Sequence, residues 1–269
     1  MGRFRSVPLV LGILLLSVFL LMAFLPTLFT PFGQKDSFGA WERPSGEHPL
    51  GTNDLGYDIY TELVYGTRDT LVIGLASSAL TMAIGTLIGI AAAREGFFGG
   101  FSNGIINVFV LLPRLVTLIV LAAFVGSGRI QLILLIAAFS WVGTARAVRA
   151  EVQHLLEQPF IEACRVYGFS GGHIAIRHIL PNLWEILLSR FLIGVNGCIM
   201  MESTLSFLGF GDLYHPTWGT MINFAYRRGA FLRQAYPYLL TPGVCIMLLS
   251  LAFYLISLYV TSERNRVQK

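Results

Sequence analysis

The sequence predicts an all-α integral membrane protein with six transmembrane helices. Its 269 residues are 55% hydrophobic and only 13% charged, and the mean hydropathy is +0.68. An ordinary soluble domain carries about 25% charged residues. Apolar runs near the length of about 20 residues that a helix needs to cross a bilayer lie at about 7–29, 70–93, 102–125, 130–150, 185–208 and 237–261.

The first run follows Arg3 and Arg5, which is also how a cleavable signal peptide begins. No small-x-small cleavage site follows it, and the run is longer than the apolar region of a usual signal peptide. We therefore expect a retained helix. Residues 1–69 then form this helix and an extracytoplasmic loop, residues 70–261 a transmembrane core, and residues 262–269 a cytoplasmic tail.

The remaining runs are separated by short polar segments. Arg94 and Glu95, with a Gly/Phe cluster, divide the second run from the third. Only residues 126–129 divide the third from the fourth, which predicts a tight hairpin. The glycine-rich and aromatic stretch 207–237 after the fifth run predicts an outer loop.

Basic residues favour both termini on the cytoplasmic side. With that orientation the cytoplasmic segments hold Arg3, Arg5, Arg94, Arg146, Arg149, Arg165, Arg177, Arg264, Arg266 and Lys269. The outer segments hold fewer, namely Lys35, Arg43, Arg68, Arg129, Arg227, Arg228 and Arg233. The sequence thus predicts a multi-pass protein of the bacterial inner membrane, in contact with lipid, with both ends inside.

A polar segment, residues 151–184, interrupts the apolar pattern between the fourth and fifth runs. Apolar residues at helical spacing over 153–167 predict a short amphipathic helix, and Gly168 suits its left-handed end. Ser170 is placed to cap a second short helix through Ile179, and Pro181 then opens the fifth span. We expect two short helices at an angle, projecting from the bilayer.

These residues carry a specific resemblance. Glu162-Ala163-Cys164, Gly168 and Ile179-Leu180-Pro181 resemble the EAA loop of bacterial ABC importer permeases. Cys164 stands where alanine is usual, and His178 where an apolar residue is usual. The alternative is an amphipathic segment that only joins two spans.

Flanking motifs narrow the resemblance to the C-type permeases for dipeptides, oligopeptides and nickel. They are residues 48–58, which read His-Pro-Leu-Gly-Thr-Asn-Asp-Leu-Gly-Tyr-Asp, then 65–68, Trp141 with 145–149, and 205–221. Asn53 replaces the usual acid and Tyr57 the usual arginine, which puts in doubt any salt bridge made at those positions. The similarity runs from about residue 48 to 264.

The resemblance implies the type I ABC importer (MetI-like) fold, with residues 162–181 as a cytoplasmic coupling helix seated in an ATPase subunit. It also implies a homologous partner permease, two ATP-binding subunits and an extracytoplasmic substrate-binding protein. ATP-driven closure of the ATPases would move the coupling loops and switch the translocation path from inward-facing to outward-facing. The substrate would be a peptide, nickel, a metal chelate or glutathione, among which the sequence does not choose.

The chain lacks the motifs of an enzyme that acts alone. No Gly-x-x-x-x-Gly-Lys-Ser/Thr loop is present to hold ATP, nor is His-Glu-x-x-His. Scattered histidines and three cysteines at unrelated spacings predict no metal site, and no basic cluster with interleaved aromatics predicts nucleic-acid binding. We therefore expect a non-catalytic subunit without a cofactor, whose partners bind ATP with magnesium.

Three polar residues in the predicted spans are candidates for the translocation path: Arg114 after Pro113 in the third, and Asn196 and Glu202 in the fifth. A charge at that depth costs several kcal/mol and marks a partner or a wet cavity. One interpretation places Arg114, Asn196 and Glu202 along the translocation path, reading a charged end of the substrate. The other makes Arg114 and Glu202 a buried ion pair that fixes helix packing, or lets them extend to the outer membrane interface.

Two other classes of function compete with the permease subunit. An autonomous secondary transporter or channel predicts inverted repeats or several intramembrane acid–base pairs, and the sequence shows no repeat. A purely structural membrane scaffold leaves the segment 162–181 unexplained. Co-purification of a nucleotide-binding subunit separates these classes from the first.

Overall fold

The computed structural model describes the backbone of residues 3–267 and the side chains of residues 7–262. Within that part the regular elements are helices, and the only β pairs are isolated bridges, Ser37 to Tyr57 and Thr52 to Asp58. The basic side chains of Arg3, Arg5, Arg264, Arg266 and Lys269 lie outside the described residues. The helices are α1 Arg3–Phe24, the 3-10 turn η1 Pro26–Leu28, α2 Ile59–Ala92, α3 Phe97–Leu111, α4 Arg114–Val125, α5 Arg129–Ser140, α6 Val142–Leu156, α7 Pro159–Val166, α8 Gly171–Ile174, the π-helix η2 Ala175–Ile179, α9 Leu180–Asn182, α10 Trp184–Leu205, the π-helix η3 Ser206–Phe210, α11 Trp218–Arg227 and α12 Tyr236–Val267.

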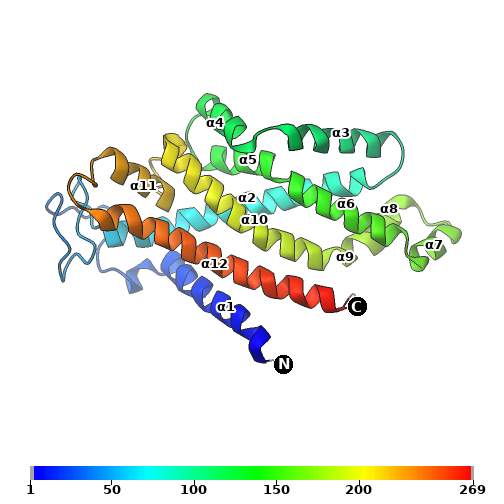
Figure 1. Cartoon of the computed structure of the whole chain (residues 1–269), viewed down its shortest axis with the longest axis horizontal. Coiled ribbons are helices and arrows are strands. Elements are labelled where there is room, and N and C mark those ends of the chain that lie inside the picture. The colour runs from blue at the N-terminus through cyan, green and yellow to red at the C-terminus, as the bar shows by residue number, and fades with distance from the viewer. Residues whose placement is uncertain (1–2, 268–269) are drawn as a thin grey trace.

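The long helices run side by side in an elongated bundle (Figure 1). Four stretches, in α1, in α2, in α10 with η3, and in α12, are long and apolar enough to cross a membrane. Two bent pairs, α3 with α4 and α5 with α6, also meet the criterion when each pair counts as one span. Together they make six spans, as the sequence predicts.

The second span starts earlier than the apolar pattern indicates. It begins at Ile59 rather than near residue 70, and α2 is 34 residues long. Asp58 caps it by accepting a hydrogen bond from the backbone N–H of Thr61 at 2.7 Å, as N-cap carboxylates do. The first turns of α2 carry polar side chains that find partners in the folded protein, so their polarity does not end the helix.

The third and fourth spans are not single straight helices. The third breaks at residues 112–113, where α3 and α4 meet at 90°, and the fourth bends by 43° between α5 and α6. Pro113 explains the first break because it lacks the backbone N–H that a continuous helix needs. The expected tight hairpin between the two spans is present, since only residues 126–128 separate α4 from α5.

The two ends of the bundle differ in their contents. Residues 25–58 and α11 gather at one end, whereas α7, α8, α9, the start of α1 and the end of α12 lie toward the other (Figure 1). The stretch 207–237 is not a simple outer loop, because it contains α11, which Thr217 and Thr220 start with a capping box. Trp218, Met221 and Ala225 on α11 are buried in the main core.

Close helix approaches depend on glycine in α2. A side chain at Gly74 would collide with Ile199 of α10, and one at Gly85 would place a Cβ 2.7 Å from the Cβ of Thr144 in α6. These contacts bring α2 against both neighbours, as small residues do at helix interfaces in membranes. Helix α2 is therefore the central element that holds the bundle together.

Candidate functional site

The segment expected to form a single helix over 153–167 is two helices. Helix α6 continues to Leu156, and α7 begins at Pro159 after a short break. Proline at the first position of α7 is favourable there, since the first N–H of a helix has no acceptor within it. The prediction of one amphipathic helix is wrong because this break turns the chain, so α7 leaves the line of α6.

The turn after α7 has the form that Gly168 predicts. Gly168 has a φ of +79°, and its N–H donates to the carbonyl of Arg165 at 3.0 Å. The N–H of Phe169 donates to the carbonyl of Cys164 at 3.1 Å. These two bonds make a Schellman motif, in which glycine takes the left-handed position without steric cost.

The second helix of the segment starts at the predicted cap. The Ser170 hydroxyl accepts from the backbone N–H of His173. The helix then passes through α8, η2 and α9, so Pro181 lies in α9 and the fifth membrane helix, α10, begins at Trp184. A π-helix is rare and frequently marks a functional site, and η2 covers the residues just before Leu180.

Buried side chains fasten this loop to the bundle. Ile161, Ile174 and Ile179 are packed in one cluster with Val148 and Val152 of α6. Ile179, predicted to couple to an ATPase, is therefore part of the attachment of the loop and not of its outer surface. The Sγ of Cys164 lies 3.7 Å from the Nε2 of His178, which joins the two halves of the loop.

The opposite face of the loop exposes large apolar side chains. Val166 and Tyr167 are each 82% exposed and Ile176 is 71% exposed. Glu162 and Ala163 lie exposed on α7, and Leu180 and Pro181 are exposed on α9. We call the exposed residues Glu162, Ala163, Val166, Tyr167, Phe169 and Ile176 the loop surface. An apolar surface of this kind at a loop marks a site for a protein partner or a membrane.

A cleft of about 820 Å³ lies between this loop and the ends of α2 and α6. Its polar lining includes Arg94, Glu95, Glu157 and Arg165. Apolar contacts thus hold one side of the loop against the bundle, and a polar cleft lies beside these contacts.

The expected pairing of Arg114 with Glu202 is wrong. Glu202 is 0% exposed, and its carboxylate accepts from the hydroxyls of Ser206 and Thr217, both at 2.6 Å, and of Ser203 at 3.2 Å. The two residues form no ion pair in the structure. Sequence reasoning placed Thr217 in an outer loop, so these hydroxyl donors were missed.

The three residues predicted to line a path do not form one site. Arg114 begins α4, and its Nη2 donates to the Oγ of Ser140 at 2.5 Å. Asn196 instead faces a groove of about 520 Å³ between α10 and α12, together with Met200, Met247 and Tyr254. The Oδ1 of Asn196 is buried without a hydrogen-bond partner.

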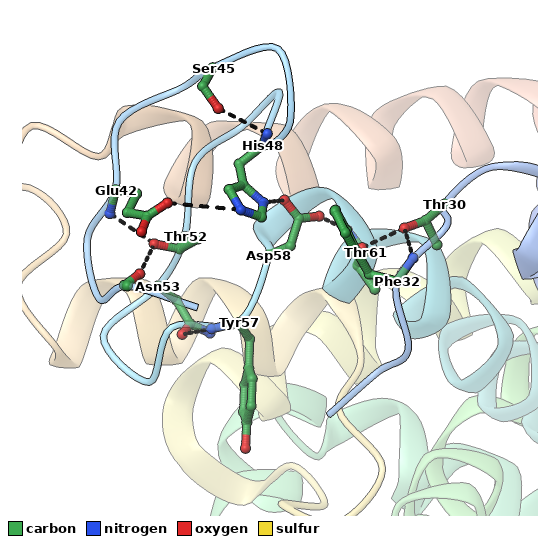
Figure 2. A network of polar contacts seen from close by, with 11 residues as sticks. Thr30, Phe32, Glu42, Ser45, His48, Thr52, Asn53, Tyr57, Asp58 and Thr61 are labelled. Atoms are coloured by element: carbon green, nitrogen blue, oxygen red, sulfur yellow. Dashed lines mark hydrogen bonds and ion pairs between the residues drawn. The ribbon is translucent and has the colours of Figure 1, made fainter. Parts of the chain in front are cut away.

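The end of the bundle that holds residues 25–58 is tied together by polar contacts (Figure 2). The Nδ1 of His48 lies 3.0 Å from the Oδ2 of Asp58, and the hydroxyls of Thr30 and Thr61 are 2.6 Å apart. Thr52 accepts from the N–H of Glu42 and donates to the carbonyl of Gly39. The residues that carry the 48–58 motif are therefore structural contacts at the start of α2.

Asn53 and Tyr57, the departures from the family pattern, also have places here. The Oδ1 of Asn53 accepts from the backbone N–H of Leu55 and of Tyr57, while its Nδ2 donates to the Oε2 of Glu62 at 3.1 Å. Nearby, Arg228 pairs with Asp54 at 2.9 Å and lies over the Phe224 ring. These contacts join the loop to α2 and α11.

A second polar cluster closes the same end. Arg129 pairs with Asp69, and its backbone N–H donates to Asp212 at 3.1 Å. Partial burial alone raises the pKa of the Asp212 carboxyl, but hydrogen bonds from His215 and from the N–H groups of Tyr214 and Arg129 outweigh it, and the pKa lies below its usual range. The cluster links α2, the start of α5 and the segment before α11.

A comparison with known protein families identifies the family of this chain. Residues 85–265 match the family described as binding-protein-dependent transport system inner membrane component. The chain belongs to this family. It is therefore the permease subunit of an ABC importer, a membrane component that works with ATPase and binding-protein partners.

Individual relatives extend the similarity of the permease beyond the matched core. A peptide permease protein of Brucella suis biovar 1 is 33% identical over 247 residues, which cover 90% of this chain and 82% of the relative. The dipeptide transport system permease protein DppC of Alkalihalophilus pseudofirmus is 30% identical over 254 residues (92% and 82%). The oligopeptide transport system permease protein OppC of Bacillus subtilis is 30% identical over 229 residues (82% and 74%).

A solved structure agrees with the fold. The permease aligns with a chain of the inward-facing MetNI methionine ABC transporter at a TM-score of 0.56 and 21% identity, covering 74% of this chain and 95% of that one. At that identity the likeness concerns the fold alone. It confirms the all-α, type I ABC importer architecture that the sequence predicts.

Proposed function

We propose that this permease carries peptides across the bacterial inner membrane. We also propose that segment 162–181 couples it to ATP hydrolysis, because an ATPase subunit binds the loop surface of this segment. The relatives that carry names of peptide, dipeptide and oligopeptide permeases support the substrate class. The observation that carries the proposal is the exposed apolar face of α7 beside the Schellman turn at Gly168. An isolated chain leaves that face in water, which favours a protein partner for it.

The roles of the predicted coupling residues divide in two. Glu162 and Ala163 on α7, with Leu180 and Pro181 on α9, lie exposed where an ATPase subunit can contact them. Cys164, Gly168 and Ile179 hold the loop in shape and on the bundle. A rigid unit attached to α6 and α10 transmits a push without deforming, which a coupling lever requires.

The remaining partners complete an importer. We assign the permease a homologous second permease, two ATPase subunits that bind ATP with magnesium, and an extracytoplasmic binding protein that delivers the peptide. The chain itself is non-catalytic and needs no cofactor in this scheme. Both termini and α7–α9 face the cytoplasm, and residues 25–58 with α11 face outward.

Co-purification from detergent tests this function. The ATPase subunit should co-purify stoichiometrically with the wild-type permease and be lost with Gly168→Pro, because proline cannot adopt the positive φ of that turn. Glu162→Lys should lose it as well, while Glu47→Lys, the same change at an exposed site at the other end, should not. A monodisperse elution profile checks that each variant is folded.

Transport by the isolated chain is the contrary outcome. If the purified permease moves peptide across liposomes without ATP or any partner, the importer scheme is wrong and the autonomous transporter is right. If the ATPase co-purifies equally with all three variants, the loop surface is not its docking site.

A further inference from the structure

Arg114 is a charged side chain at the break of a membrane span, and no carboxylate pairs with it within the described residues. Its Nη2 donates to Ser140, but its Nε is buried and has no hydrogen-bond partner. An unpaired charge inside a bilayer is costly and is retained where it serves a function. Among the described residues the guanidinium thus has no counter-charge, so a partner or a ligand could supply one.

Polar groups from three other helices surround the guanidinium. Ser140 belongs to α5, and the Cys198 thiol of α10 interacts electrostatically with Arg114. Thr81 of α2 is 3% exposed and lies on the other side of that thiol. Buried polar groups are ordinarily hydrogen-bonded, so the unpartnered Nε of Arg114 indicates a place for a polar ligand.

The backbone at the same point favours an anion. Arg114 is the first residue of α4, and Pro113 before it provides no side-chain cap. The first N–H groups of a helix lack acceptors within it, and its dipole places positive potential there. Broken membrane helices in transporters present such ends to anionic groups of their substrates.

We propose that Arg114 and Ser140, with the N-terminus of α4, form a subsite that binds a carboxylate of the substrate during its passage. This inference rests on the proposed function and names the chemical group of the substrate that the translocation path would bind. A carboxylate fits because it accepts paired hydrogen bonds from the planar fork of a guanidinium. Ser140 is a positioning residue, since its hydroxyl also donates to the carbonyl of Ile136 and so fixes the direction of Arg114.

The test compares two probes in the complete importer reconstituted in liposomes with its binding protein. The probes are trialanine, which carries a free carboxylate, and trialanine amide, which does not. The ratio of their kcat/KM values should fall about 10- to 100-fold in Arg114→Gln, the range expected for hydrogen bonds to a charged group. The preference of the binding protein cancels, because the same binding protein serves both permeases.

Three further variants separate recognition from packing. Arg114→Lys keeps the charge without the fork and should give an intermediate ratio, whereas Ser140→Ala should lower the ratio by less. Arg68→Gln removes an exposed arginine in the first third of α2 and should leave the ratio unchanged. A role limited to helix packing would lower transport of both probes equally.

Each outcome decides a different statement. A carboxylate-to-amide ratio that Arg114→Gln leaves unchanged overturns the subsite alone. Loss of the partner permease from the Arg114→Gln complex on size exclusion would assign the arginine to a subunit contact and also overturn the subsite. If the wild-type complex transports neither probe, the peptide part of the proposed function fails and this inference fails with it.

Discussion

At one end of the bundle α7–α9 expose Val166, Tyr167 and Ile176. At the other end residues 25–58 bury His48 against Asp58, and the Thr52 hydroxyl bonds the backbone of Glu42 and Gly39. Both segments interrupt the apolar pattern and both look like polar loops in the sequence. The first leaves its apolar side chains without cover, while the second satisfies its polar groups within the chain. We therefore expect the first segment to serve partner binding and the contacts of the second to serve stability.

Removing the exposed side chain of Tyr167 should produce the largest effect. Tyr167→Ala should weaken binding of the purified ATPase subunit about tenfold or more, as truncation of an interface aromatic does, with no change in the thermal unfolding of the permease. A fluorescence titration measures the binding. Tyr214→Ala is the matched control, because Tyr214 is equally accessible at the other end.

A fall in thermal stability with Tyr167→Ala would contradict the comparison, because it would show that the loop surface is part of the fold. Unchanged binding would place the ATPase contact elsewhere on the chain.

At the other end, Asp58→Ala should lower stability and leave ATPase binding intact. The change removes the cap of α2, worth about 1 kcal/mol, and leaves buried His48 without its carboxylate, worth about 1–3 kcal/mol. Thermal unfolding in detergent should therefore report a loss of about 2–4 kcal/mol. Glu47→Ala, at an exposed site in the same segment, is the control and should change nothing.

Weaker ATPase binding by Asp58→Ala, at a temperature where the variant is folded, would show that the two ends are coupled through α2 rather than independent.

The smallest expected effect concerns acid. The pKa of Asp212 is lower in the folded protein than its unfolded value of about 3.9, so its contribution is present above about pH 4 and is lost as the pH falls through the folded pKa. The contribution should stay below about 1 kcal/mol, because its partner His215 is half exposed. Asp212→Asn should therefore unfold at a lower temperature than wild type at pH 6, and the difference should disappear as the pH falls through the folded pKa of Asp212. A difference that persists unchanged in acid would mean that the charge of Asp212 contributes nothing.

Local sequence signals predicted the shape of the α7–α9 loop well. Gly168 and Ser170 act through backbone bonds only a few residues away, so their roles were visible in the sequence. The break between α6 and α7 was missed, because the apolar spacing continues across it. Which side chains face outward depended on Val148 and Val152 of α6, whose position relative to the loop no local pattern gives.

The errors in the membrane part share a cause. The helix starting at Ile59 was predicted to begin later, because Glu62 and Asp69 look like loop residues until Asn53 and Arg129 are seen to contact them. Glu202 was given Arg114 as a partner, although Thr217 and Ser206 satisfy it. In each case the partner lies far along the chain or on an element that the sequence read as a loop.

The sequence alone determined that this chain is an all-α membrane permease of an ABC importer, because hydropathy fixes spans and the EAA-like residues occupy a short, contiguous segment. Tertiary structure alone decided that the third span breaks by 90°, that Ile179 anchors the loop instead of facing a partner, and that Arg114 stands apart from Glu202. Burial and pairing depend on which distant residues meet when the helices pack. A local sequence pattern does not show these contacts. Only the folded bundle therefore shows the loop surface, the polar contacts at the opposite end and the position of Arg114.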